Sequence, residues 1–559
     1  MRKYGVELNN AHRMDKELEA EIHPLKHDDR KPRGNLENQT EKNRSFKKTS
    51  HHSGFAQCRT VAFFFLLFSC LFVVFIISFI IPCPDRPISQ KMWEINYNTA
   101  VTYDFMEFKD INEDTVQDVI FLYKDSNSSS SGNISCTDEG LTSPCVFLAA
   151  VSGANGSLLW ERPVVQDVAY MECFNYEMPN GPPSSCFIVG EKKSSFLAVD
   201  FTIGEILWHL PWRFGVNDSI LSPFLRIPDV TGNGVEDLLL FIRSGREIKS
   251  YLYSSTTGDQ VGSMSRLNIE GEVGYVMHVT NTGAYYIIFH SASFLLGYPL
   301  KEIYDEMTGG RSIFEEDPYW KIMIDNVTHR MPLSLSSGTI RYLMKVPRNT
   351  GNDILLVKSD ACELLDGQRL ILKWTLNMSE VVRKPVLGYY KPGALAIVLE
   401  NGTGVQRKIF IVDAASGAIL WSHTLNAFAG TPKSAAVMTA DRRSAFFFWS
   451  SSNQMETVDS QKTLYMFHPT FPDNFLELTN ITKNIVAFNV LFEQNHHASY
   501  VLLTGPTDQD WPGLVSLSKQ KVKENVLNAR VIWLGQQAKP ENEQSIKDRF
   551  YELRYKREA

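Results

Sequence analysis

The sequence predicts an all-β protein, a β-propeller that follows one membrane-spanning helix. Three observations predict it: an uncharged apolar segment at 61–81, short apolar runs separated by turn residues beyond residue 90, and a hairpin phrase that recurs about every fifty residues. The 559 residues are 43% hydrophobic and 21% charged. This composition excludes a polytopic membrane protein and a chain that is disordered throughout.

The amino-terminal part combines a polar tail with the apolar segment. Residues 1–60 are polar and predict a disordered cytoplasmic tail. A helix over 61–81 is roughly 31 Å long at about 1.5 Å per residue, enough to cross a hydrocarbon core. A buried core helix would show a polar face, and a cleaved signal peptide would end in small residues, so we expect a signal-anchor.

Charges beside the anchor predict its orientation. Residues 42–60 carry five basic and no acidic side chains, which places the amino side in the cytosol. We therefore expect a single-pass type II protein at the cell surface, with internal membranes as the alternative. The tail carries net +4, which leaves −11 for the rest of a chain whose net charge is −7. An acidic ectodomain gives no reason to expect nucleic acid as a partner.

Glycosylation sequons and cysteines are consistent with this topology. Four cysteines flank loops rich in Ser, Pro and Gly, and local pairing would join Cys136 to Cys145 and Cys173 to Cys186 in an oxidising compartment. Free thiols or the other two pairings are the alternatives. Eight N-x-Ser/Thr sequons follow the anchor and are predicted glycosylation sites: Asn127, Asn133, Asn155, Asn217, Asn326, Asn377, Asn401 and Asn480.

The recurring phrase is an apolar strand followed by Gly-x-x-x-Trp. Glycine supplies the positive φ of a tight turn, and the returning strand carries a tryptophan that packs between sheets. Copies at this spacing indicate a repeat protein. The phrase runs from Gly156 to Trp160, from Gly204 to Trp208 and from Gly417 to Trp421, with weaker copies at Gly258 and at Gly367, the last reaching Trp374 after an insertion.

Each repeat also has a predicted inner strand. Eight units of about four strands fit an eight-bladed propeller over 82–534; seven blades are the alternative, because 300–339 holds an insertion whose strands are not evident. Either 93–96 or 530–533 could close the ring against the last blade. The inner strands are predicted at 101–108, 168–174, 221–227, 274–279, 340–346, 384–390, 434–439 and 485–492.

Two predicted inner hairpins carry oxygen ligands at alternate positions, directly before a strand. Ca²⁺ prefers six to eight oxygen ligands, which a curled loop with alternate side chains inward can supply. The alternative is a plain turn whose side chains accept hydrogen bonds from its own backbone. The candidate metal ligands are Asp110, Asn112, Asp114 and Asp118 in the first loop and Asp229, Thr231, Asn233 and Asp237 in the second.

These loops resemble the FG-GAP repeats of integrin α-chain propellers, and the Gly-x-x-x-Trp hairpins resemble the blades of quinoprotein-type propellers. With the anchor, the exit Ile81–Pro87, the turn Ala150–Ser157 and the strand Ser444–Trp449, the chain closely resembles the integrin α FG-GAP repeat-containing membrane proteins, the family with sequence similarity 234. The resemblance covers essentially the whole chain. It implies a single-pass glycoprotein without an established reaction.

No catalytic motif accompanies these features. The sequence lacks a Gly-x-Ser-x-Gly elbow, a His-Glu-x-x-His helix, a phosphate-binding Gly-rich loop and a Cys-x-x-Cys pair. We therefore expect a binding, scaffold or receptor-like module for a protein partner and no enzyme; the alternative is a quinoprotein-like enzyme with a cofactor in the central funnel. At the carboxyl end, 535–559, a capping box at Ser545 and apolar Ile546, Phe550 and Leu553 predict an amphipathic helix.

Overall fold

The computed structural model divides the chain into two compact units, Met1–Asp85 and Arg86–Ala559. It describes residues 53–80, 89–125, 134–174, 184–191, 195–211, 215, 218–310, 312–331, 338–378, 380–403, 405–428, 430–451, 461–534 and 542–557. In the first unit, helix α1 spans Ser53–Ile80. Among the described residues, no helix is both long enough and apolar enough to cross a membrane. The anchor at 61–81 stays a prediction.

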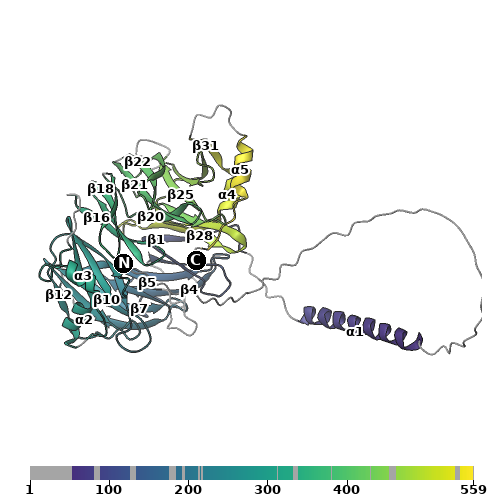
Figure 1. The fold of residues 1–559 in the computed structure, drawn as a ribbon, viewed down its shortest axis with the longest axis horizontal. Helices are drawn as coiled ribbons and strands as arrows, with labels where there is room; N and C mark the ends of the chain where they lie inside the picture. Colours follow the sequence, from purple (N-terminus) through teal and green to yellow (C-terminus); the bar gives the residue numbers. More distant parts are fainter. Residues whose placement is uncertain are drawn as a thin grey trace, which may run out of the picture. The chain divides into compact units, whose positions relative to one another are not determined.

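The second unit is a propeller of eight antiparallel blades within the described residues (Figure 1). The strands lie in seven sheets, because the seven-stranded sheet joins two blades through β1 (Met92–Lys109). Strand β1 pairs with β30 up to Ala100 and with β2 from Ala100 onward. The first strand of each blade was predicted correctly in all eight cases, and the seven-bladed alternative is wrong.

The blades follow one another along the chain, each beginning at the ring of first strands. Blade 1 consists of the end of β1 with β2 (Asp118–Asp125), β3 (Cys145–Val151) and β4 (Leu158–Val165). Blade 2 consists of β5 (Val168–Phe174), β6 (Ser185–Gly190), β7 (Ser195–Asp200) and β8 (Ile206–Pro211). Blade 3 consists of β9 (Asp218–Ile227), β10 (Asp237–Ser244), β11 (Glu247–Tyr253) and β12 (Ser265–Leu267). Blade 4 contains β13 (Val273–Val279), β14 (Tyr285–Ser291) and β15 (Phe294–Pro299).

The second half of the ring repeats this order. Blades 5 and 6 consist of β16 (Ile340–Pro347), β17 (Asn352–Lys358), β18 (Ala361–Leu365) and β19 (Leu372–Asn377), and of β20 (Val386–Lys391), β21 (Ala394–Thr403), β22 (Gln406–Asp413) and β23 (Ile419–Asn426). Blade 7 holds β24 (Ala435–Met438), β25 (Ser444–Ser451), β26 (Lys462–Phe467), β27 (Asn474–Ile481) and β31 (Arg530–Trp533). Blade 8 holds β28 (Ile485–Glu493), a single turn η1 (Gln494–His496), β29 (His497–Thr504), β30 (Gly513–Lys521) and the start of β1.

Two terminal segments competed in the sequence to close the ring. Trp93, at the start of β1, pairs with Lys519 of β30 and so completes blade 8. The other candidate, β31, instead adds a fifth strand to blade 7, where Arg530 pairs with Glu477 of β27. The prediction for 93–96 is confirmed and that for 530–533 is wrong, because the edge of β30 is already covered by β1.

The hydrophobic core lies between the blades. Eight buried clusters each combine side chains of two neighbouring blades. The cluster between blades 2 and 3, for example, packs Phe187 and Trp208 against Leu238 and Tyr253. Each sheet buries both faces in this way, which explains why the second and third strands of most blades are continuous apolar runs.

At four junctions between described blades, the tryptophan of one blade packs on the hairpin glycine of the next. Because Gly204 and Gly258 have no Cβ, the rings of Trp160 and Trp208 can lie against them: a Cβ would stand 2.7 Å from the ring in both cases. Trp208 also donates a hydrogen bond to the Ser255 carbonyl, at 3.0 Å. The same contact joins Trp93 to Gly156 and Trp374 to Gly417.

Two repeats depart from the phrase. In blade 5 the left-handed position belongs to Leu370, with φ +57°, and Trp374 follows four residues later. The predicted insertion between Gly367 and Trp374 is therefore wrong. In blade 4 the segment after β15 forms the helices α2 (Leu300–Thr308) and α3 (Pro318–Met323). From α3 the fully buried Trp320 donates a hydrogen bond to Gln368 of blade 5.

The carboxyl-terminal helix packs against the propeller. Helix α5 (Glu543–Tyr551) buries Ile546 and Phe550 in the cluster between blades 7 and 8 and contacts α4 (Val522–Asn528). The predicted capping box at Ser545 is wrong. The N-cap lies three residues earlier, at Asn542, whose side chain accepts a hydrogen bond from the Gln544 amide.

Candidate functional site

The first acidic loop connects β1 to β2 in blade 1. Its last ligand candidate, Asp118, is fully buried and accepts hydrogen bonds from the amides of Ile111 at 2.8 Å, Asn112 at 3.3 Å and Gly153 at 2.8 Å. Burial raises the pKa of Asp118 to about 6. This carboxyl thus ties the loop to the next hairpin of the blade, where a Cβ on Gly153 would strike the Gln117 carbonyl.

The other candidates in this loop also contact its backbone. Asp110 accepts a hydrogen bond from the Thr115 amide, and Asp114 from the Val116 amide, both at 2.8 Å. Asn112 exchanges hydrogen bonds with Asp114. One carboxylate oxygen, Oδ1 of Asp110, is buried and has no hydrogen-bond partner among the described residues. Four predicted ligands are therefore brought into one loop.

In the second acidic loop, between β9 and β10 of blade 3, the side chains accept more hydrogen bonds from the amides of the loop itself than in the first loop. Asp229 accepts hydrogen bonds from the amides of Gly232, Asn233 and Gly234, and Asp237 from those of Val230 and Thr231. Burial acts to raise the pKa of Asp229, but the amide hydrogen bonds outweigh it, so that this pKa lies below its ordinary value. The Asn233 side chain accepts from the Val235 amide and reaches Thr256.

Blade 5 has an aspartate, Asp353, at the position of Asp118 but lacks the pattern of metal-ligand candidates before it. Asp353 accepts a hydrogen bond from the Gly367 amide, as Asp118 does from Gly153. Its charge is balanced by Lys373 at 2.6 Å and Arg348 at 3.5 Å. The last aspartate therefore has a structural role in both blades. Among the described residues no group of three His, Cys, Asp or Glu side chains is arranged to hold a metal, and Ca²⁺ at either loop stays a prediction.

Both predicted disulfides are present. Cys136 pairs with Cys145 in the connection between β2 and β3, and Cys173 pairs with Cys186 across β5 and β6. The second disulfide lies in blade 2 at the end of the first strand, the position that the acidic loops occupy in blades 1 and 3. Cys362 is buried in a hydrophobic cluster, and this burial raises the pKa of its thiol to about 12, so the thiol stays protonated.

The predicted glycosylation sites differ in what the structure says of them. Asn401 is half-buried in β21. Asn127, Asn133 and Asn217 lie outside the described residues. The exposed sites are Asn155, Asn326, Asn377 and Asn480.

The structure adds a site that the sequence did not indicate, on the face of the ring where the first strands begin. We call it the start face; the acidic loops follow the first strands and lie on the opposite face. Two clefts of about 830 and 850 Å³ open here, and Lys384, just before β20, lines both. The first lies between blades 3, 4 and 5, and the second is lined by blades 1, 6, 7 and 8.

Charged side chains of the first strands differ in sign from one blade to another. Asp104 and Glu107 of β1 have pKa values raised by burial, an effect that Lys433 opposes. On the other side, burial lowers the pKa of Lys345 in β16, and the neighbouring charges of Arg226 and Lys384 lower it further. Blade 1 therefore contributes acidic side chains to the ring, and blades 3, 5 and 6 contribute basic ones. These charges form no recognisable motif; the only sequence signal was the presence of charged residues inside predicted inner strands.

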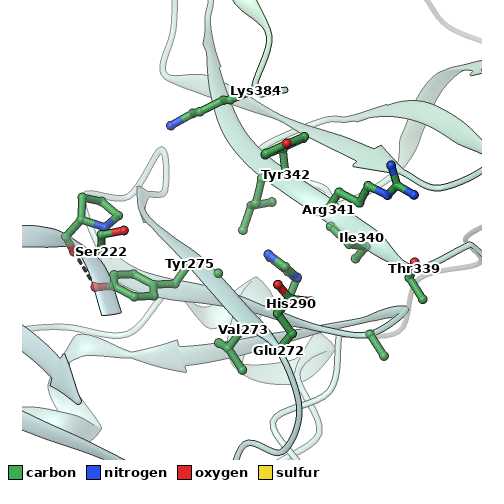
Figure 2. A pocket seen from close by; sticks show the side chains of 14 residues that line it. Ser222, Glu272, Val273, Tyr275, His290, Thr339, Ile340, Arg341, Tyr342 and Lys384 are labelled. Atoms are coloured by element: carbon green, nitrogen blue, oxygen red, sulfur yellow. Dashed lines mark hydrogen bonds between the residues drawn. The ribbon is translucent and has the colours of Figure 1, made fainter. Parts of the chain in front are cut away.

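Figure 2 shows the first cleft from close by. The His290 ring from β14 lies in its middle, with Lys384 and Arg341 on separate sides and Glu272 below. His290 is 5% exposed, and its Nδ1 has no hydrogen-bond partner among the described residues. Burial lowers the pKa of His290 to about 4, so the ring is neutral at physiological pH.

Comparison with known proteins assigns the family. The sequence matches the FAM234A/B beta-propeller model over residues 93–556. The chain belongs to this family. It is 51% identical to human Protein FAM234A over 97% of this chain and 99% of the relative, and 50% identical to the rat protein over 98% and 100%. Protein FAM234B of chicken is 26% identical over 86% of this chain and 80% of that protein. Member A is therefore the nearer of the two. The resemblance to the family with sequence similarity 234 is confirmed.

Solved structures are more distant. The WD40 domain of SCAP from fission yeast matches with a TM-score of 0.40 and 11% identity, covering 67% of this chain and 92% of that one. An exotype rhamnogalacturonan lyase, YesX, matches with a TM-score of 0.41 and 11% identity, covering 76% and 72%. Likenesses this weak say nothing about ligands or activity.

Proposed function

We propose that this chain is a single-pass type II membrane glycoprotein whose non-cytosolic propeller binds a protein partner, as a scaffold or receptor-like module at the cell surface or on an internal membrane, without catalysis of its own. The uncharged segment at 61–81, the basic residues before it and the eight sequons beyond it support the topology. Two disulfides in the propeller support an oxidising compartment.

The start face is the observation that carries the binding role. Its two clefts share Lys384, and each contains charges of both signs. Glu272 and Arg341 line the first cleft, and Glu107 and Lys433 line the second. Fixed charges of both signs on one recessed surface favour a polar partner held in a fixed orientation. A ring whose eight core clusters each join two blades keeps such a surface preorganised, which lowers the entropy lost on binding.

The topology is tested on intact cells. Glycosidase treatment should increase the electrophoretic mobility of the protein, and external protease should degrade everything except the tail and the anchor. A protein resistant to protease until the membrane is permeabilised, yet glycosylated, would indicate an internal membrane. Unchanged mobility after glycosidase treatment would refute the type II topology.

The binding role is tested by proximity labelling from a peroxidase fused to the carboxyl terminus. Lys384→Glu reverses a charge on the start face, and Lys391→Glu reverses one at the far end of β20, the strand that Lys384 precedes. We expect the set of labelled proteins to lose a member with Lys384→Glu and to keep it with Lys391→Glu. Identical sets for both variants and the unaltered protein would contradict a partner on this face.

The quinoprotein alternative predicts a bound chromophore. A visible absorption spectrum of the purified full-length protein separates the two functions, because a protein-binding module has no absorption above the aromatic band. A quinone absorption band that persists through gel filtration would overturn our proposal.

A further inference from the structure

The cleft between blades 3, 4 and 5 contains a buried hydrogen-bonding group without a partner. His290 stands on the middle strand of blade 4 and is 5% exposed, so its ring is removed from bulk solvent. Its Nδ1 finds no hydrogen-bond partner among the described residues. Buried polar groups are paired in the great majority of cases, so a buried unpaired nitrogen at the floor of a cleft points to a ligand.

The ring is held in this position by the residue opposite it. Gly274 of β13 is the cross-strand neighbour of His290. A Cβ on Gly274 would lie 2.4 Å from the His290 Nε2, so only glycine leaves room for the imidazole over the strand. The pair therefore places the ring across the start of blade 4, inside the cleft (Figure 2).

Two cations accompany this ring, from different blades. Arg341 belongs to β16 and Lys384 precedes β20, and the side chains of both are exposed. Among the described residues neither has a carboxylate partner within ion-pair distance, whereas many other basic side chains of the propeller do, Lys373 and Arg348 among them. Beyond residue 60 the chain carries net −11, so unpaired positive charges on one recessed surface stand out.

We propose that this cleft binds a ligand with at least two carboxylates, one held by Lys384 and one by Arg341, while His290 hydrogen-bonds to the ligand between them. The inference rests on the proposed role of the propeller as a binding module and names the chemistry that it recognises. The cleft volume of about 830 Å³ suits a ligand of small-molecule size or a short acidic peptide segment.

The charges of the cleft favour separate carboxylates over phosphate. The planar guanidinium of Arg341 can bind either anion with two parallel hydrogen bonds, so the selectivity has to come from the other charges. Glu272 lies on the cleft wall close enough to act on His290, and its negative charge opposes a doubly charged phosphate more strongly than a singly charged carboxylate. Separation of the two cations across the cleft (Figure 2) favours a ligand whose charges are also apart.

Isothermal titration of the full-length protein in detergent tests the proposal with three probes: citrate, a peptide of six glutamates and inorganic phosphate. We expect citrate or the peptide to bind and Lys384→Gln and Arg341→Gln each to weaken that binding about tenfold or more, because each variant removes a charge-assisted hydrogen bond. Lys391→Gln, at the other end of β20, is the matched control and should change the affinity less than about twofold.

The histidine is tested separately. Gly274→Ala should displace the His290 ring and weaken binding while keeping both cations; if that variant fails to fold, His290→Leu removes the hydrogen bond directly. His290→Asn should restore part of the affinity relative to His290→Leu, since its amide lies near the position of Nδ1 and can replace that hydrogen bond. Affinity unchanged in these histidine-site variants would overturn the role of His290.

Each outcome of the titration has one meaning. Binding of citrate supports a free di- or tricarboxylic acid as the ligand, and binding of the peptide alone supports an acidic segment of a protein. Equal affinity for phosphate would reveal an unselective cluster of cations and overturn the proposal, as would the absence of binding by both carboxylate probes. Loss of the site in this assay, with a labelled partner still sensitive to Lys384→Glu, would leave the proposed function standing.

Discussion

Alanine at Gly258 places a methyl group against the indole of the neighbouring blade. Gly258 has φ +74°, and its Cβ would lie 2.7 Å from the Trp208 ring. A left-handed backbone costs a residue with a Cβ roughly 1 kcal/mol. Overpacking a filled contact costs about 1–3 kcal/mol more, because Trp208 is held by Phe196 and by its hydrogen bond to Ser255. We expect Gly258→Ala to lower the free energy of unfolding by about 2–4 kcal/mol.

Blade 3 offers a matched control for this substitution. Gly245 also has positive φ, +65°, but no atom lies within 4 Å of its Cβ position. Gly245→Ala should therefore cost only the backbone strain, roughly 1 kcal/mol. The difference between the two variants measures the contact between blades 2 and 3.

Urea unfolding of the full-length protein, followed by far-ultraviolet circular dichroism, gives both free energies. A double mutant adds a second criterion: Trp208→Leu removes the ring, so Gly258→Ala should cost less in that background than in the unaltered protein. Equal losses for Gly245→Ala and Gly258→Ala, or strict additivity in the cycle, would refute the argument that this glycine exists to receive the indole.

Four further predictions concern the acidic loops, the disulfides and the glycans. If the first loop binds Ca²⁺, the cation should raise the melting temperature, and Asp114→Ala should reduce that gain; an identical melting temperature with chelator would leave a plain turn. Burial raises the pKa of Asp118 from its ordinary 3.8 to about 6, so the stability gained by its protonation is complete below pH 3.8 and is lost as the pH rises through 6; Asp118→Asn should flatten this part of a stability-against-pH curve. Replacing both Cys136 and Cys145 by serine should cost about 2.5 kcal/mol in urea unfolding, the loop-closure entropy of a nine-residue separation, and no loss would contradict this role. Asn480→Gln should remove one glycan-sized step in mobility, and an unaltered band would show that this sequon is unused.

Much of the architecture could be predicted because it is local. Alternation of apolar and turn residues placed all eight first strands, and loop-flanking cysteines predicted both disulfides. Local reasoning failed where one residue type stood in for another. Leu370 takes the left-handed position that glycine has in other blades, so the phrase in blade 5 was read with an insertion that does not exist.

The candidate sites divide in the same way. The acidic loops are continuous in sequence, so their ligand candidates were found, although their hydrogen bonds to backbone amides were not. The start face was missed because its residues are scattered. Lys384 and His290 are far apart along the chain, and each is an isolated polar residue within or beside an apolar strand.

The sequence by itself determined the strands, the turns and the number of blades, since each depends on residues close together in the chain. Tertiary structure decided which surfaces meet. Each Gly-x-x-x-Trp phrase looks like one hairpin, yet Trp160 and Trp208 pack on Gly204 and Gly258 of the next blades. The tryptophan of blade 6, Trp421, instead donates a hydrogen bond to the Pro472 carbonyl of blade 7. The charged clefts of the start face have the same origin. Closing the ring brings the first strands of distant blades together, and no local pattern records which side chains then share a cleft.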